Sequence, residues 1–135
     1  MFNALSARPN TPKLAHTEAE IEVVLLHILE ASNIPHQHQV SCEYGRIDVL
    51  TDTAIFEVKR APTNHYLKQA VGQLATYQQA YPHVKKLIMV TTEVAAADIS
   101  TEMVKKLGVP VLILPTAIDR LTPDHTVNLL QLLQQ

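Results

Sequence analysis

The chain has 135 residues, a length typical of one globular domain with a single core. Its hydrophobic fraction of 47% and charged fraction of 18% are ordinary for a folded soluble domain, and they exclude a fibrous repeat or disorder throughout the chain. The formal net charge of -2 provides no general excess of positive charge for binding phosphates, so any contact with nucleic acid must be local.

Residues 1–16 contain two prolines and lack the basic start and long apolar run of a signal peptide, so we expect a flexible N-terminal arm. A single domain should then span residues 17–135. No apolar run approaches the roughly 20 residues that a membrane helix needs. Cys42 is the only cysteine, which excludes an internal disulfide and suits a reducing compartment, so we expect a cytoplasmic protein.

The first half of the domain predicts one helix followed by three strands. Thr17 is the expected N-cap, because acidic residues and then an apolar stripe at helical spacing follow it. The helix should end before Pro35. The predicted strands are 36–43, 46–51 and 54–59, and the short turn between the second and third predicts a hairpin.

The second half predicts alternating helices and strands. The expected elements are a helix from residue 64 to Pro82, a buried strand 85–92, a helix 95–108, a buried strand 109–115 and a last helix 122–135. A run of strands followed by alternating elements indicates an α/β fold with a mixed sheet flanked by helices.

The hairpin between residues 46 and 59 carries the candidate site. Its hydrophobic pattern sets Val49 opposite Phe56 and Asp48 opposite Glu57. One side of the hairpin then collects four apolar residues and is the expected core face: Ile47, Val49, Phe56 and Val58. The two carboxylates share the opposite face, where like charges so placed are destabilising.

Two interpretations explain this carboxylate pair. In the structural one, Lys59 lies diagonally from Asp48 and Arg46 diagonally from Glu57, so that four charges neutralise one another on a hydrated face. In the functional one, Mg²⁺ binds between the carboxylates, since it prefers hard oxygen ligands. Lys59 would then orient or help deprotonate a water, or stabilise charge on a phosphate.

These residues resemble the PD-(D/E)XK nuclease superfamily, which includes restriction enzymes, Holliday-junction resolvases and some homing endonucleases. The resemblance consists of Ile47-Asp48, eight hairpin residues, Glu57-Val58-Lys59, and then Gln73 and Tyr77 in the next helix as a Q-x-x-x-Y element. Ile47 stands where the family name has proline. The resemblance implies a restriction-endonuclease-like αβββαβ core over about residues 17–92, extended here by a further α-β-α.

The same resemblance implies the ligand set and the roles of the site residues. Asp48 and Glu57 would bind Mg²⁺, with Mn²⁺ as a substitute, and the Val58 carbonyl would be a further ligand. Lys59 would be catalytic. Gln73 would contact the attacking water, the surroundings of Lys59 or the DNA backbone, although the same stretch can be a polar helix face.

In this family a glutamate of the first helix often completes the metal site. Glu18 is the first choice, because Ile21 and Leu25 follow it at helical spacing and place it beside the apolar stripe. Glu22 is the alternative. An ordinary first-turn acid stabilised by the helix dipole would also explain Glu18.

The expected function is therefore a metal-dependent DNA endonuclease, similar to the resolvase or homing-endonuclease branch. The alternative is a catalytically inactive nuclease-like domain that binds nucleic acid or protein. A homo-oligomer, either a dimer or a tetramer, would enlarge the DNA-binding surface, and the leucine-rich C-terminal tail is a candidate contact. Histidines give no competing zinc site, because His36 and His38 have no further ligand pair nearby.

Overall fold

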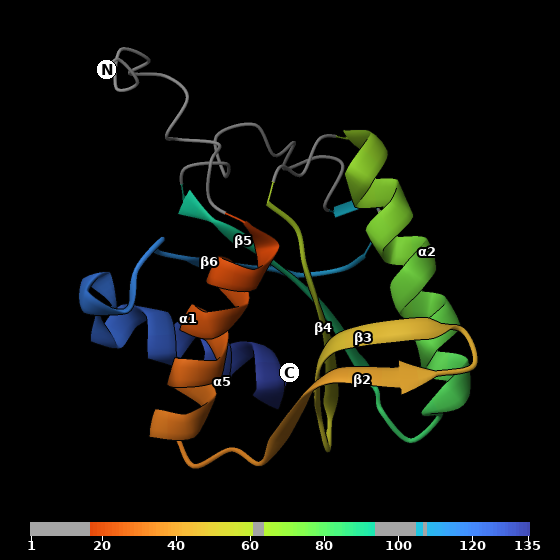
Figure 1. The fold of residues 1–135 in the computed structure, drawn as a ribbon, viewed down its shortest axis with the longest axis horizontal. Helices are drawn as coiled ribbons and strands as arrows, with labels where there is room; N and C mark the ends of the chain where they lie inside the picture. Colours follow the sequence, from red (N-terminus) through yellow and green to blue (C-terminus); the bar gives the residue numbers. More distant parts are fainter. Residues whose placement is uncertain (1–16, 61–63, 94–104, 107) are drawn as a thin grey trace, which may run out of the picture.

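The computed structural model describes residues 17–60, 64–93, 105–106 and 108–135, and it contains a five-stranded mixed sheet with helices on both faces (Figure 1). The elements are α1 (Glu18–Ala31), β2 (His36–Cys42), β3 (Gly45–Thr51), β4 (Ala54–Val58), α2 (Asn64–Ala80), β5 (Lys86–Thr92), β6 (Val111–Leu114), η2 (Ile118–Arg120) and α5 (Pro123–Gln134). The strand order is β2-β3-β4-β5-β6. The first three strands are antiparallel and the last three parallel. This confirms the predicted α/β fold with a mixed sheet.

Two predicted segments lie wholly or largely outside the described residues. They are the N-terminal arm 1–16 and the helix 95–108, of which only 105–106 and 108 are described.

Helix α1 begins where the sequence predicts. The Thr17 hydroxyl accepts a hydrogen bond from the Glu20 amide at 3.1 Å, and the Glu20 carboxylate accepts one from the Thr17 amide at 2.9 Å. This reciprocal capping box satisfies two backbone donors at the start of the helix. The buried side of α1 includes Glu22 as well as apolar residues.

The β3–β4 hairpin has the predicted register, with Val49 paired to Phe56 and Leu50 to Ile55. Its turn is stabilised by the Thr51 hydroxyl, which accepts a hydrogen bond from the Ala54 amide at 3.0 Å. Threonine hydroxyls support turns in this way, so the hairpin forms without an Asn-Gly or Asp-Gly pair.

Both faces of the sheet are buried, so the hydrated face of the structural interpretation is absent among the described residues. Helices α1 and α5 cover one face and α2 covers the other (Figure 1). On the first face, the α1-side core includes Val49, Phe56 and Val58 of the hairpin. On the second, the α2-side core includes Leu50 and Ile55. The face that carries Glu57 is therefore under α2, and Glu57 is buried there.

Ile47 does not share a face with Val49, contrary to the prediction, because it packs in the α2-side core. The β2–β3 ladder pairs His38 with Val49 and Val40 with Ile47, but the residues between, Gln39 and Asp48, are not paired. Gln39 has φ +52°, a left-handed conformation that a strand does not normally contain. The strict alternation of faces fails at this irregularity, which places Ile47 on the other side.

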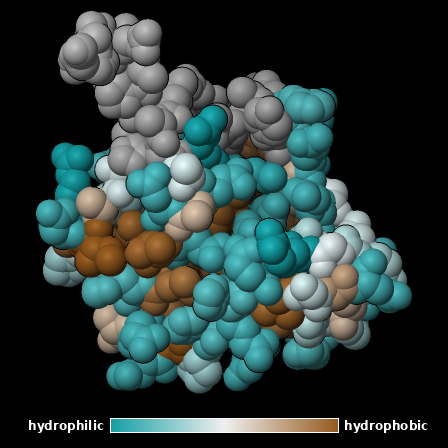
Figure 2. Space-filling view, in the orientation of Figure 1, coloured by the Kyte–Doolittle hydropathy of each residue, from teal (hydrophilic) through white to brown (hydrophobic). Residues whose placement is uncertain are grey.

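The leucines of the C-terminal tail pack on the protein's own core. Leu129 is buried in the α1-side core, and Leu132 and Leu133 pack against it. Val23 of α1, Ile118 of η2 and Val127 of α5 are apolar side chains that stay exposed. The face seen in Figure 2 is mostly hydrophilic, with a few hydrophobic areas. None of the described helices combines the length and apolar character that crossing a membrane requires.

Candidate functional site

Asp48 lies where β3 and β4 separate. The last backbone pair on this side of the hairpin joins Val49 and Phe56. One residue further along, the Asp48 side chain takes the place of a backbone acceptor on β3. Its Oδ2 accepts a hydrogen bond from the Val58 amide of β4 at 2.8 Å. This contact satisfies a backbone donor that would otherwise be unpaired, and it holds the carboxylate at the end of β4.

Glu57 is buried beside Asp48, with 5% of its surface exposed. Burial is the main cause that raises the pKa of Glu57 to about 8, the negative charge of Asp48 raises it further, and Lys59 opposes the rise. The Lys59 ammonium lies 3.4 Å from Glu57 Oε2. The other oxygen, Oε1, is buried and has no hydrogen-bond partner among the described residues.

The contacts differ from the diagonal charge arrangement of the structural interpretation. Lys59, which directly follows β4, forms an ion pair with Glu57, and Arg46 is exposed. An unpartnered oxygen on a buried carboxyl group is unfavourable in a purely structural ion pair. A proton on Glu57 relieves this cost, because the raised pKa of Glu57 also reflects a side-chain hydrogen bond with Asp48.

Of the two first-helix glutamates, Glu18 is exposed and Glu22 is buried, with 8% of its surface exposed. Burial raises the pKa of Glu22, a hydrogen bond from Gln39 opposes the rise, and the charge of Asp48 adds to it. The charge of Asp48 therefore acts on Glu22. The structure thus brings Asp48 and Glu57 together, buries Glu22 and leaves Glu18 at the surface.

The Gln73 and Tyr77 side chains do not form one stripe against the sheet. Gln73 is exposed, whereas Tyr77 is buried in the α2-side core. The Arg46 amide donates a hydrogen bond to the Tyr77 hydroxyl, and a Cβ on Gly45 would lie 3.2 Å from that oxygen. Burial raises the pKa of Tyr77, as does the nearby charge of Glu57. Tyr77 therefore anchors the start of β3 to α2 beside the carboxylates.

The donor set at this site suits a hard divalent cation, although the carboxylates currently have other partners. Among the described residues, no three His, Cys, Asp or Glu side chains are arranged to hold one metal ion together. Asp48 bonds to Val58, Glu57 contacts Lys59, and Glu22 bonds to Gln39. Carboxylate oxygens are nevertheless the ligands that Mg²⁺ prefers, and Glu57 Oε1 is a buried acceptor that lacks a donor.

Thr91 is a feature of this region that the sequence analysis missed. Its hydroxyl is fully buried and has no hydrogen-bond partner among the described residues. Glu57 pairs with Met89 on the parallel strand β5, so Thr91 lies one pleat further along that strand on the same, α2-covered face. A threonine inside the apolar run of residues 87–92 was the available signal.

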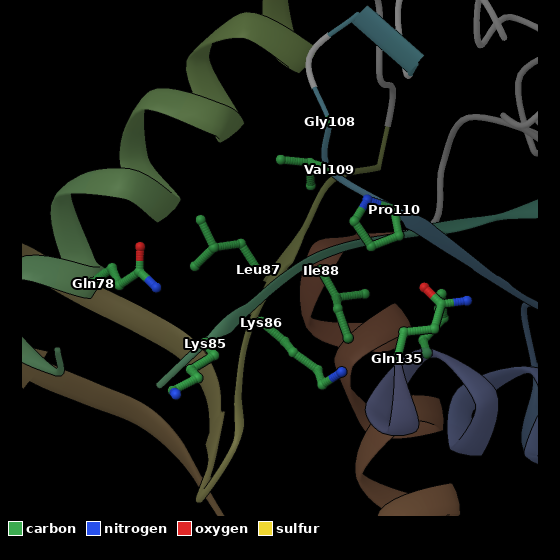
Figure 3. Close-up of a pocket in the computed structure, with 10 residues that line it drawn as sticks. Gln78, Lys85, Lys86, Leu87, Ile88, Gly108, Val109, Pro110 and Gln135 are labelled. Carbon is green, nitrogen blue, oxygen red and sulfur yellow. The ribbon is translucent and has the colours of Figure 1, made fainter. Parts of the chain in front are cut away.

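A cavity of about 270 Å³ lies away from these carboxylates, at the start of β5 (Figure 3). Lys85, Lys86, Gln78 and Gln135 contribute its polar side chains, and none of its lining residues is acidic. Lys86 pairs with Ala54, whereas Glu57 pairs with Met89, so the cavity and the carboxylates occupy opposite ends of the sheet. The carboxylate cluster, with its perturbed pKa values, is the stronger candidate site.

Comparison with models of known protein families, with curated proteins and with solved structures finds no match to this chain.

Proposed function

We propose that this protein is a metal-dependent DNA endonuclease of the PD-(D/E)XK type, with a restriction-endonuclease-like core. The observation that carries the proposal is the cluster at the end of β4, where Asp48, Glu57 and Lys59 meet and Glu57 Oε1 is buried without a partner. The order of one helix, three antiparallel strands, a helix and a parallel strand supports the same assignment.

Asp48 and Glu57 would hold the divalent cation, Mg²⁺ or in its place Mn²⁺, with the Val58 carbonyl as a further ligand. Glu22 is the first-helix carboxylate that is buried and on which the charge of Asp48 acts. When bound, the cation would supply Lewis-acid stabilisation of the charge that develops on the phosphate.

Lys59 would orient the attacking water and stabilise negative charge on the phosphate oxygens. Its ammonium already lies 3.4 Å from Glu57 Oε2, and only a small part of its side chain is exposed. In the hydrolysis, the water oxygen bonds to phosphorus while one bridging P–O bond breaks, and the leaving oxygen takes up a proton. Partial burial strengthens the interaction of the ammonium with such charge, because water screens it less.

The direct test is cleavage of plasmid and branched DNA by the purified protein in Mg²⁺ or Mn²⁺, with metal binding measured by calorimetry. Lys59→Ala should abolish cleavage and leave folding and metal binding nearly unchanged. Lys85→Ala is the matched control, because this exposed lysine lies at the opposite end of the sheet. A wild-type protein that neither cuts any of these DNA forms nor binds metal would exclude the proposal.

A second candidate function is a nuclease-like domain that binds nucleic acid or protein without cutting it. Two observations favour it: the net charge of -2, and the rise in the pKa of Glu57 to about 8, which leaves this carboxyl group largely protonated at neutral pH without metal. DNA binding that is unaffected by Mg²⁺ and by Lys59→Ala, without cleavage, would support this function.

We also propose that the protein works as a homo-oligomer, because one chain of this size with few basic residues covers little DNA. The leucines of α5 are already used in the α1-side core. The exposed apolar side chains Val23, Ile118 and Val127 offer the alternative contact. Light scattering on the wild type and on Val127→Ser would test it, since a monomeric wild type contradicts the proposal.

A further inference from the structure

Thr91 is a polar residue at a position where packing favours an apolar one. It lies near the end of β5, it is fully buried, and its hydroxyl has no hydrogen-bond partner among the described residues. Valine has nearly the same shape as threonine, and it avoids the free energy that a buried hydroxyl without a partner costs. Fold stability therefore does not explain the hydroxyl at this position.

The sheet places Thr91 directly beside Lys59. Val58 pairs with Val90, and the Lys59 amide donates a hydrogen bond to the Val90 carbonyl at 2.8 Å, so the parallel ladder continues one residue beyond β4. Adjacent strands lie about 4.8 Å apart, which makes Lys59 and Thr91 lateral neighbours. Val90 packs in the α1-side core, and side chains alternate along a strand, so Thr91 lies on the α2-covered face with Lys59 and Glu57.

The Lys59 ammonium has few acceptors on this face. It carries three N–H donors, and its one ion pair among the described residues is with Glu57 Oε2. The distance of 3.4 Å is longer than the roughly 2.7–2.9 Å of a charge-assisted hydrogen bond, and only 16% of the side chain is exposed. A group that bound Glu57 would take this acceptor away. The Thr91 hydroxyl is then the neighbouring buried acceptor that has no donor.

We propose that Thr91 is a positioning residue for Lys59, whose ammonium donates a hydrogen bond to the Thr91 hydroxyl when Glu57 is bound to another group. The ammonium thus has two alternative acceptors on one face of the sheet: Glu57 in the free protein, and Thr91 once Glu57 is occupied. Its other N–H donors stay available to the attacking water or the phosphate. Thr91 itself is too deeply buried to touch the substrate. The inference rests on the proposed function, which gives Lys59 its role and Glu57 its ligand.

Replacing Glu57 by methionine tests this exchange of acceptors without metal or DNA. Methionine is flexible and apolar, and it removes both carboxyl oxygens, so the Lys59 ammonium turns to Thr91. Thr91→Val should raise the urea concentration at the midpoint of unfolding in the wild type, where the hydroxyl has no partner. In Glu57→Met the same substitution should lower the midpoint, because it removes a hydrogen bond to a charged group. A shift of the same sign in both backgrounds overturns the inference.

Two controls test the route of this effect. Adding Lys59→Met to Glu57→Met should make Thr91→Val raise the midpoint again, because the donor is then gone; a midpoint that still falls overturns the inference. Thr92→Val is the matched control, because Thr92 is the next residue of β5, is also buried and lies on the opposite face of the sheet. It should shift the midpoint equally with and without Glu57→Met.

Cleavage of plasmid DNA in Mg²⁺ measures the consequence for catalysis. Thr91→Val should lower kcat by about 10-fold or more, the loss expected when a hydrogen bond to a charged group is removed. Thr91→Ser keeps the hydroxyl and should retain most of kcat. A merely structural role predicts that Thr91→Val cuts as fast as the wild type, and that result overturns the inference.

The outcomes distinguish this inference from the proposed function. A wild-type protein that neither cuts DNA nor binds metal overturns the proposed function, and with it the catalytic role of Thr91, whatever the unfolding experiments show. A wild type that cuts DNA, together with same-sign shifts in urea or full activity of Thr91→Val, overturns the inference alone.

Discussion

Replacing Glu57 by glutamine tests the central feature of the site, a carboxyl group that is buried next to another carboxylate. The pKa of Glu57 is raised from 4.5 to about 8, mainly by burial and then by the charge of Asp48. Between these two values the folded protein keeps a proton that the unfolded chain has lost. Glutamine has nearly the same shape and does not titrate in this range, so Glu57→Gln removes this dependence with little change in packing.

The magnitude follows from proton linkage. Because the folded state binds more protons than the unfolded state, the free energy of unfolding falls as pH rises, by about 1.4 kcal/mol per pH unit. From pH 4.5 to about 8 the fall reaches at most about 5 kcal/mol for Glu57. The stabilising effect of protonation is complete below pH 4.5 and lost above about 8. Wild type and Glu57→Gln should thus be similar at low pH, with the variant more stable by several kcal/mol at high pH.

Urea unfolding followed by circular dichroism, at a series of pH values in EDTA, measures this difference. EDTA removes divalent cations, which would bind the ionised carboxylate and hide the effect. Asp52→Asn is the control: Asp52 is an exposed turn residue, and the change removes one carboxylate without disturbing the turn. Equal pH dependence in wild type and Glu57→Gln would refute the reasoning, because Glu57 would then titrate alike in the folded and unfolded states.

Three further predictions concern neighbouring residues. Asp48→Asn should raise thermal stability in EDTA above pH 8, where Glu57 is ionised, because it relieves like-charge repulsion. It should also reduce the stabilisation that Mn²⁺ produces, and an undiminished Mn²⁺ effect would contradict the role of Asp48. Thr91→Val should increase the free energy of unfolding by about 1 kcal/mol in urea, because it removes a buried hydroxyl without a partner among the described residues; a decrease would reveal a hydrogen bond. Gly45→Ala should decrease the free energy of unfolding by about 1–3 kcal/mol, because Gly45 has φ +131° and lies close to the Tyr77 hydroxyl. Gly72→Ala should instead increase it by about 0.5–1 kcal/mol, because Gly72 lies in a helix with open space around it. Equal effects of the two substitutions would contradict this reasoning.

Local patterns predicted most of the described fold. The Thr17 cap and the pairing of Val49 with Phe56 are both as expected, because each depends on residues close together in the chain. The mixed sheet also follows from the order of elements. The motif residues Asp48, Glu57 and Lys59 do meet at one end of β4, since a hairpin register fixes which side chains lie across from each other.

The parts that sequence reasoning missed depend on contacts between distant segments. Ile47 was assigned to the wrong face, because strict alternation does not foresee a left-handed residue on the neighbouring strand. The sequence left open whether Glu57 lies on a hydrated face, whereas in the structure it is buried under α2. Glu18 and Glu22 are one helical turn apart and share the same side of α1, so periodicity alone does not separate them.

The sequence by itself therefore determined the elements, the hairpin register and the carboxylate pair, because these follow from side-chain alternation and from spacings of a few residues. Only the tertiary structure decided that Glu57 is buried and that Glu22, rather than Glu18, is the buried glutamate of α1. The physical reason is that both depend on how α1, α2 and β2 pack across the sheet. The rise in the pKa of Glu57 and the hydrogen bond from Gln39 to Glu22 exist only once that packing excludes water.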